Sequence, residues 1–203
     1  MTERTHRSAR PAAVLIAAAI GTGTLTGIGA TVSTAPAFAD VPASASDTQT
    51  ARYEVDFLTG MIDHHAMAVQ MAETCVDKAV HPELVDLCES IIASQSAQIE
   101  QMQTWLQDWY GISHEPEMTS AQSMQHLTGL EGGDYEVAFM REMTRHHWAA
   151  VREAEKCLTN AAHPELISLC HNIYSSQLAQ INQMQTWLAE WYDVNYGRPT
   201  ETA

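Results

Sequence analysis

The chain has 203 residues, of which 45% are hydrophobic and 17% are charged. This composition is typical of a folded domain with a substantial core and excludes a largely disordered chain. The formal net charge of −15 argues against a nucleic-acid partner, because phosphate backbones are bound chiefly through Lys and Arg. An acidic surface is instead compatible with binding cations.

Residues 1–39 have the pattern of a secretory signal peptide. A basic start with three arginines precedes a small and apolar stretch centred on Val14-Leu15-Ile16, and Ala37-Phe38-Ala39 is a cleavage signal of the A-x-A type. The glycines and threonines of residues 21–31 disfavour a membrane anchor. We therefore expect cleavage near Ala39, an extracytoplasmic (secreted or periplasmic) mature protein, and no stable insertion into a membrane.

An internal duplication organises the rest of the chain. After residues 40–52, which are small and polar and predict a flexible linker, residues 53–110 align without a gap to residues 135–192. The offset is 82 residues, and 33 of the 58 aligned positions are identical. A repeat of this size is typically one supersecondary unit that buries its apolar face against its neighbour.

Each repeat is predicted to be a helical hairpin. Seam side chains recur every three or four residues from Phe57 to Cys75, and the same rhythm continues from Cys88 to Trp109. Pro82 suits the first turn of a helix. Because the residue before a proline is kept out of helical geometry, the first helix should end near Val80.

Two hairpins supply the four helices that enclose a core. The predicted fold is therefore all-α, a four-helix bundle with pseudo-two-fold symmetry, whose hairpins span residues 53–112 and 134–194. Residues 113–133 form a linker with a short helix that Thr119 or Ser120 caps and that ends before Gly132-Gly133. Residues 195–203 form a C-terminal tail.

The four cysteines are predicted to form one disulfide within each hairpin. Cys75 and Cys88 are equally far from the His81-Pro82 turn, and antiparallel helices bring such positions opposite each other. In an oxidising compartment we expect the bonds Cys75–Cys88 and Cys157–Cys170, each stabilising by about 3 kcal/mol. Free buried thiols are the alternative, and the absence of a C-x-x-C motif disfavours redox chemistry.

The helical seams contain polar side chains that an ordinary core does not favour. A buried imidazole or amide costs roughly 1–3 kcal/mol unless it is hydrogen-bonded or bound to something. The first repeat places His64 and Gln95 on its seam, and the second places His146 and Gln177 there. With neighbouring side chains they give a candidate metal-ligand set: Met61, His64, His65, Met71 and Met102 in the first repeat, and Met143, His146, His147, Met184 and the carboxylate of Glu153 in the second.

Imidazole with thioether favours copper. Thioether is soft and selects Cu(I), while imidazole binds Cu(I) and Cu(II). Zinc favours cysteine, histidine and carboxylate, calcium and magnesium need several oxygens, and di-iron bundles need Glu-x-x-His motifs, which neither hairpin has. The expected ligand is copper as Cu(I), Cu(II) or both.

Other interpretations of the same residues stay open. Methionine at helical spacing is often core filler, a single helical histidine is often structural, and Gln95 and Gln177 could simply hydrogen-bond across the core. We expect His81 and His163 at the surface and the paired tryptophans of the second helices at the bundle ends. In the linker, a short amphipathic helix explains the following residues as well as an accessory copper site does: Met118, Met124 and His126.

Three sequence elements resemble one known family. They are Phe57-x3-Met61-Ile62-x-His64-His65-x2-Ala68-Val69-x-Met71-Ala72, then His81-Pro82-Glu83-Leu84, then Gln95-x3-Ile99-x2-Met102-x2-Trp105-Leu106-x2-Trp109-Tyr110-Gly111. The second repeat has the same pattern. Over about residues 53–192 the chain resembles the domain of unknown function 305 family.

This resemblance implies a ferritin-like helical architecture and copper handling, because the family includes a cyanobacterial periplasmic copper metallochaperone that binds copper through Met and His. The second repeat departs from the pattern where Thr144, Arg145 and Glu153 stand, which implies an altered or weaker second site. By motif match the resemblance implies copper ligation by Met61, His64, His65, Met71, Met102, Met143, His146, His147 and Met184.

The preferred function is an exported copper-binding protein that sequesters the metal or delivers it, as a metallochaperone, to an unidentified partner. The alternatives are a metal-free structural bundle and a ferritin-like metal oxidase, which the scarcity of seam carboxylates disfavours. We expect no catalysis and a monomer or homodimer.

Because Met71 is a soft ligand and Glu153 is not, the first repeat should bind Cu(I) more tightly than the second. Protons should compete with copper between pH 7 and 5, near the reference histidine pKa of about 6.5.

Overall fold

The computed structural model describes residues 45–117 and 121–194, and this part of the chain is helical with no strand. The helices are α1 (Ala45–Lys78), α2 (Pro82–Tyr110), α3 (Ala121–Thr128), α4 (Gly132–Asn160) and α5 (Pro164–Tyr192). The prediction of an all-α fold is confirmed. The predicted signal peptide, Met118, the Thr119/Ser120 cap and the tail from residue 195 lie outside the described residues.

The helix boundaries follow the local sequence with two differences. Pro82 and Pro164 begin α2 and α5 as predicted. However, α1 already begins at Ala45, so most of the segment 40–52 that we expected to be a flexible linker is helical. Asp47 in the first turn complements the helix dipole, and extending an existing helix is far easier than starting one. The second difference is that α4 already begins at Gly132, in the glycine pair expected to precede the hairpin, and the φ of 55° there suits glycine.

None of the described helices is long and apolar enough to cross a membrane.

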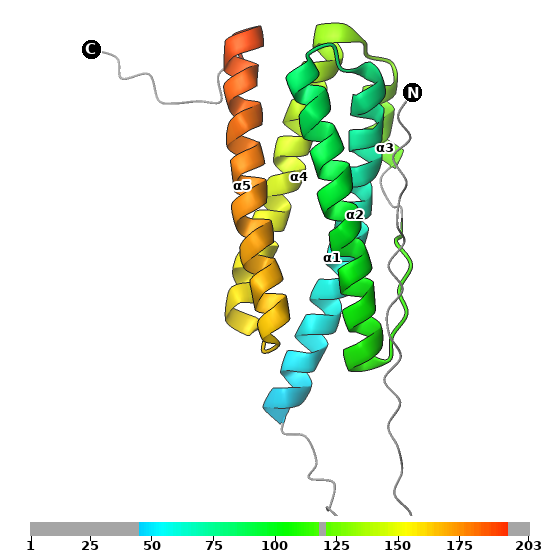
Figure 1. Cartoon of the computed structure of the whole chain (residues 1–203), viewed down its shortest axis with the longest axis vertical. Helices are drawn as coiled ribbons and strands as arrows, with labels where there is room; N and C mark the ends of the chain where they lie inside the picture. The colour runs from blue at the N-terminus through cyan, green and yellow to red at the C-terminus, as the bar shows by residue number, and fades with distance from the viewer. Residues whose placement is uncertain (1–44, 118–120, 195–203) are drawn as a thin grey trace, which may run out of the picture. The chain divides into compact units, whose positions relative to one another are not determined.

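The bundle is built from two antiparallel hairpins that meet through their first helices (Figure 1). α1 packs against α2, α4 packs against α5, and α1 and α4 pack against each other between the hairpins. The chain passes from the first hairpin to the second through residues 111–131, which include α3. Lys78 at the end of α1 fixes the end of this linker, donating to the carbonyls of Thr128 and Leu130 at 3.0 Å each.

Both predicted disulfides are present. Cys75 is bonded to Cys88 and Cys157 to Cys170, with Cα–Cα distances of 6.2 and 6.1 Å, and all four residues are fully buried. Each bond sets which residues of its two helices lie at the same level. Because both helices of a hairpin run without interruption from the disulfide to its open end, this alignment of the two helices holds along the whole hairpin.

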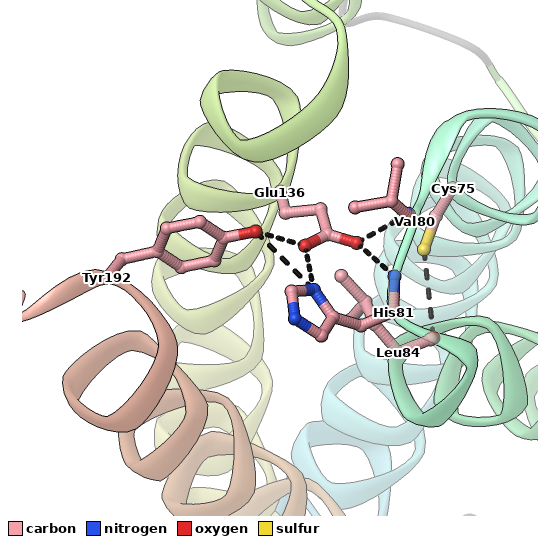
Figure 2. Close-up of polar contacts among 6 residues, drawn as sticks. All are labelled: Cys75, Val80, His81, Leu84, Glu136 and Tyr192. Carbon is pink, nitrogen blue, oxygen red and sulfur yellow. Dashed lines mark hydrogen bonds and ion pairs between the residues drawn. The ribbon is translucent and has the colours of Figure 1, made fainter.

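The turn of each hairpin docks onto the open end of the other through a contact that we call a turn latch. In the first latch, the carboxylate of Glu136 in α4 accepts hydrogen bonds from the backbone N–H groups of Val80 at 2.6 Å and His81 at 2.8 Å. It also accepts from Nδ1 of His81 at 2.6 Å and from the hydroxyl of Tyr192. Figure 2 shows these donors converging on Glu136.

The second latch repeats the first with the hairpins exchanged. The carboxylate of Glu54 in α1 accepts from the backbone N–H groups of Ala162 at 2.6 Å and His163 at 3.0 Å, from Nδ1 of His163 at 2.6 Å and from the hydroxyl of Tyr110. Burial alone raises the pKa of Glu54 and Glu136, but these hydrogen bonds to the charged form outweigh it, so that the pKa of both carboxyls is lowered.

Stacked aromatic rings cover each latch. The His81 ring lies on Trp191, with centroids 4.0 Å apart, and His163 lies on Trp109 at 3.9 Å. Trp187 and Trp105 extend the two stacks. The tryptophans therefore pack at the bundle ends as expected. His81 and His163, which we expected at the surface, keep only 36% and 37% of their side chains exposed, because each turn is held against the other hairpin.

Replacing Glu136 by Gln should lower the free energy of unfolding by about 1–3 kcal/mol. The glutamine amide has the same size as the carboxylate but lacks the negative charge that strengthens the hydrogen bonds from the latch donors. Urea unfolding at pH 7 measures the change, with the exposed Glu83→Gln at the same turn as the control. A loss no larger than that of Glu83→Gln would contradict a stabilising role for the latch. Glu54→Gln should behave like Glu136→Gln.

Candidate metal-binding site

Four histidines form a polar layer across the middle of the bundle, which we call the histidine layer (His64, His65, His146 and His147). α1 and α4 run in opposite directions (Figure 1), and their contact brings the rings of His64 and His146 face to face, with centroids 3.6 Å apart and planes at 32°. Within each hairpin the neighbouring rings are 6.2 Å apart. The sequence predicted a histidine pair in each hairpin, and the structure joins both pairs at one place.

His65 and His147 are fully buried, and each is oriented by a glutamine of its own hairpin. Nε2 of His65 lies 2.7 Å from Oε1 of Gln98, and Nε2 of His147 lies 2.7 Å from Oε1 of Gln180. An amide oxygen only accepts hydrogen bonds, so Nε2 carries the proton and Nδ1 keeps its lone pair. Metal-binding histidines are usually held in this way through their second ring nitrogen. Sequence reasoning missed both glutamines, although their identity at aligned positions was a signal.

Six buried ring nitrogens of the histidine layer have no hydrogen-bond partner within the described ranges. They are both nitrogens of His64, both of His146, and Nδ1 of His65 and His147. The amides of Gln95 and Gln177, 3% and 2% exposed, are also unpartnered there. An unsatisfied buried polar group costs about 1–3 kcal/mol, and native interiors contain few. With this many unsatisfied polar atoms, the histidine layer is a candidate ligand-binding site.

The candidate methionines are all buried, but they fall into two core halves. The cluster that we call the Glu54 half includes Phe57, Met61, Met102 and Cys157. The cluster that we call the Glu136 half includes Cys75, Met71, Met143 and Met184. Each half combines the turn end of one hairpin with the open end of the other. Met71, which the sequence grouped with Met61 and Met102, therefore lies among the methionines of the second hairpin.

Glu153 occupies the position that aligns with Met71, but it does not replace Met71 inside the core. Its side chain is 50% exposed and pairs with Nζ of Lys156 at 2.7 Å. Its charge acts on His64 and on Tyr53, both of the first hairpin. The carboxylate of Glu153 thus lies beside the first hairpin, although Glu153 is a residue of the second hairpin.

Burial keeps the four imidazoles neutral. It lowers the pKa of His65 to about 3 and the pKa values of His64 and His147 to about 4, and it lowers the pKa of His146 well below its ordinary value. Neutral imidazole is the form that binds a metal ion. The expectation that protons compete with copper between pH 7 and 5 assumed an unperturbed pKa, and with the pKa values lowered by burial we expect such competition at lower pH instead.

A short strap crosses the first hairpin next to the histidine layer. Residues 111–117 run back along α2, where the side-chain amide of Gln103 donates to the carbonyl of His114 at 2.9 Å. Nε2 of His114 and the backbone N–H of Glu117 both contact Oδ1 of Asp63 at 2.8 Å. Asp63 directly precedes His64, and the aligned residue of the second hairpin is Arg145, which cannot accept these bonds.

The donor set decides which metal suits the site. Among residues 45–117 and 121–194, no three His, Cys, Asp or Glu side chains are grouped so that they could hold a metal ion. Imidazole of the histidine layer together with thioether sulfur of the buried methionines would be a soft donor combination. His126, for which an accessory copper site and a short amphipathic helix were both open, is exposed, while Met118 and the side chain of Met124 lie outside the described residues.

Both the sequence and the fold of this chain match known proteins. The sequence model of DUF305, a domain of unknown function, matches residues 54–188. The fold is similar to CopM in its Cu(I)-bound form, with 34% identity over 68% of this chain and 97% of that chain and a TM-score of 0.63, and to CopM in its Cu(II)-bound form, with the same identity and shares and a TM-score of 0.64.

A DUF305 protein from Streptomyces coelicolor, described as a candidate secreted protein, is 28% identical over 68% of this chain and 91% of that chain, with a TM-score of 0.62. A search of curated proteins finds no match.

The metal-free protein should lose stability as the pH falls from 7 towards 4. The unfolded chain protonates its histidines near pH 6.5, whereas the folded chain resists until about pH 3–4. Stability is therefore complete above pH 6.5 and falls by up to about 1.4 kcal/mol per pH unit for each buried histidine. Below about pH 4.5 the lowered pKa values of Glu54 and Glu136 add to the loss.

Urea unfolding of metal-free protein with intact disulfides at pH 7, 6 and 5 checks this expectation. The double variant His64→Gln/His146→Gln should show a shallower dependence on pH. An unfolding free energy that is the same at pH 7 and 5 would contradict the neutral, buried state of the layer.

Proposed function

Since the chain belongs to the DUF305 family, we propose that it is an exported copper-binding protein that holds copper with histidine and methionine side chains at its histidine layer. It sequesters the metal or hands it on, and it carries out no catalysis of its own. Copper is the cargo of this protein. The residues proposed to bind it are His64, His65, His146 and His147 with the buried methionines on either side of them.

One observation carries this proposal, namely the six buried ring nitrogens without a hydrogen-bond partner in the described part of the chain. A structural core satisfies its imidazoles, because each unsatisfied one costs stability. Here Gln98 and Gln180 satisfy one nitrogen of His65 and His147 and leave the other free. Such a half-satisfied layer suits a protein that stabilises its histidines with a metal ion.

The softness of the donors supports copper over other metals. Thioether and neutral imidazole select Cu(I) and also accept Cu(II), and the structurally similar CopM has been solved with Cu(I), Cu(II) and silver. Zinc and di-iron sites rely on cysteine or carboxylate donors. The two cysteine pairs are closed as disulfides, and the carboxylate of Glu153 pairs with Lys156. A ferritin-like oxidase is accordingly less well supported.

Export is part of the proposal. Two disulfides are stable in an oxidising compartment, and the described helices include none that could cross a membrane. The basic and apolar N-terminal pattern that ends at Ala39 is the proposed signal peptide.

Copper should raise the melting temperature of the mature protein. A ligand that binds only the folded state stabilises it by about 2.7 kcal/mol when free ligand is a hundredfold above Kd. For a domain of this size that corresponds to a shift of roughly 5–10 °C. Thermal unfolding is measured with none, one and two equivalents of Cu(II), or of Cu(I) kept reduced by ascorbate, which leaves the disulfides intact.

The double variant His64→Gln/His146→Gln should lose most of the copper-dependent shift. Its control, His171→Gln, removes an exposed histidine outside the layer and should keep the shift. If neither oxidation state of copper raises the melting temperature of the parent protein, the copper-binding proposal is wrong and the metal-free structural bundle is favoured.

A further inference from the structure

We propose that the metal sites are shared between the hairpins, so that Met71 of the first hairpin binds metal together with Met143 and Met184 of the second. The Glu54 half then keeps Met61 and Met102 as its thioethers. This inference rests on the proposed function and specifies which residues form each site and which site prefers Cu(I).

The disulfides fix the levels of the methionines within each hairpin. Met61 lies fourteen residues before Cys75 and Met102 fourteen residues after Cys88. Met143 and Met184 have the same spacing from Cys157 and Cys170. Fourteen residues are about four helical turns, so the members of each pair face each other across their own hairpin.

Antiparallel packing of α1 against α4 then decides where Met71 lies. The contact between His64 and His146 marks the crossing point. Moving from His64 towards the end of α1 means moving from His146 towards the start of α4. Met71, after His64, and Met143, before His146, therefore lie on the same side of the histidine layer. The buried cluster of the Glu136 half contains both of them.

The same reasoning places Glu153, after His146, on the side of Met61, which precedes His64. This agrees with the electrostatic effect of Glu153 on His64 and Tyr53. The two halves are therefore unequal. One side of the layer has the buried methionines Met71, Met143 and Met184, and the other has Met61 and Met102 with a carboxylate nearby.

This imbalance has a chemical consequence. Additional thioether favours Cu(I) and Ag(I), whereas imidazole with carboxylate is more compatible with Cu(II). The Glu136 half should hold the tighter Cu(I) site and the Glu54 half the weaker one. The sequence assigned the tighter site to the first repeat as a unit. The shared arrangement instead joins Met71 to the methionines of the second repeat.

The test uses Ag(I), which stands in for Cu(I) and does not change oxidation state, with calorimetric titration of the mature protein. Met71→Leu should weaken the tighter site by about tenfold or more, the size expected for losing a group that supports a metal. Met140→Leu is the matched control, because Met140 is buried in the same half and the aligned residue of the first repeat is Leu58. Both changes conserve volume and should leave the fold intact.

Double-mutant cycles identify the partners of Met71. Effects of residues that act on one bound ion are non-additive, whereas distant sites add. Met71→Leu should therefore be coupled to Met143→Leu and additive with Met61→Leu. The converse variant, Glu153→Met, should strengthen the weaker site, because it supplies a third thioether on the side of Met61. Silver X-ray absorption should report fewer sulfur neighbours in Met71→Leu and more in Glu153→Met.

The outcomes separate this inference from the proposed function. If the parent protein binds neither Ag(I) nor copper in either oxidation state, both are wrong, and if it binds Cu(II) alone, the shared Cu(I) site is wrong while copper binding stands. If it binds but Met71→Leu behaves like Met140→Leu, or is coupled to Met61→Leu and not to Met143→Leu, the sharing between hairpins is wrong while copper binding stands. Coupling to Met143→Leu together with a gain in Glu153→Met supports it.

Discussion

The buried carboxylates of Glu54 and Glu136 constrain how the two hairpins dock. A carboxylate without exposure to water needs several donors to remain charged. Each of these finds most of its donors at the turn of the opposite hairpin, and a tyrosine hydroxyl of its own hairpin supplies the last one. With both ends fixed, α1 cannot slide along α4 without breaking a latch. The face-to-face contact of His64 and His146 lies midway between the latches and depends on this register. The geometry of the polar layer is therefore determined at the two ends of the bundle.

Local features of the fold follow from the sequence because they depend on residues that are close along the chain. The three- and four-residue spacing of seam side chains predicted the long helices, Pro82 and Pro164 predicted the starts of α2 and α5, and cysteines equally far from each turn predicted the disulfide pairs. Extension of α1 back to Ala45 was not predicted, because small and polar residues are compatible with both a linker and a continuing helix.

The composition of the candidate site was less predictable, because it depends on how the hairpins dock. The sequence identified candidate residue types, which stay a prediction, and the structure shows that the ring nitrogens of His64 and His146 are buried and unpartnered in the described part of the chain. It could not show that Met71 lies with Met143, since helical periodicity gives the face of a residue but not its partner on another hairpin. Glu54, Glu136, Gln98 and Gln180 were missed because single polar residues on a helix usually face solvent. Their exact repetition at aligned positions was the available signal.

The reciprocal latches also govern how the bundle comes apart. In many repeat proteins each unit contacts only its neighbours, so the ends can unfold while the rest persists. Here each hairpin supplies the turn at one end and the acceptor carboxylate at the other, and each core half takes residues from both. Separating the hairpins disrupts both latches and both halves together. Two copies of one sequence unit thus behave as a single cooperative folding unit, in which neither repeat retains its core when the other unfolds.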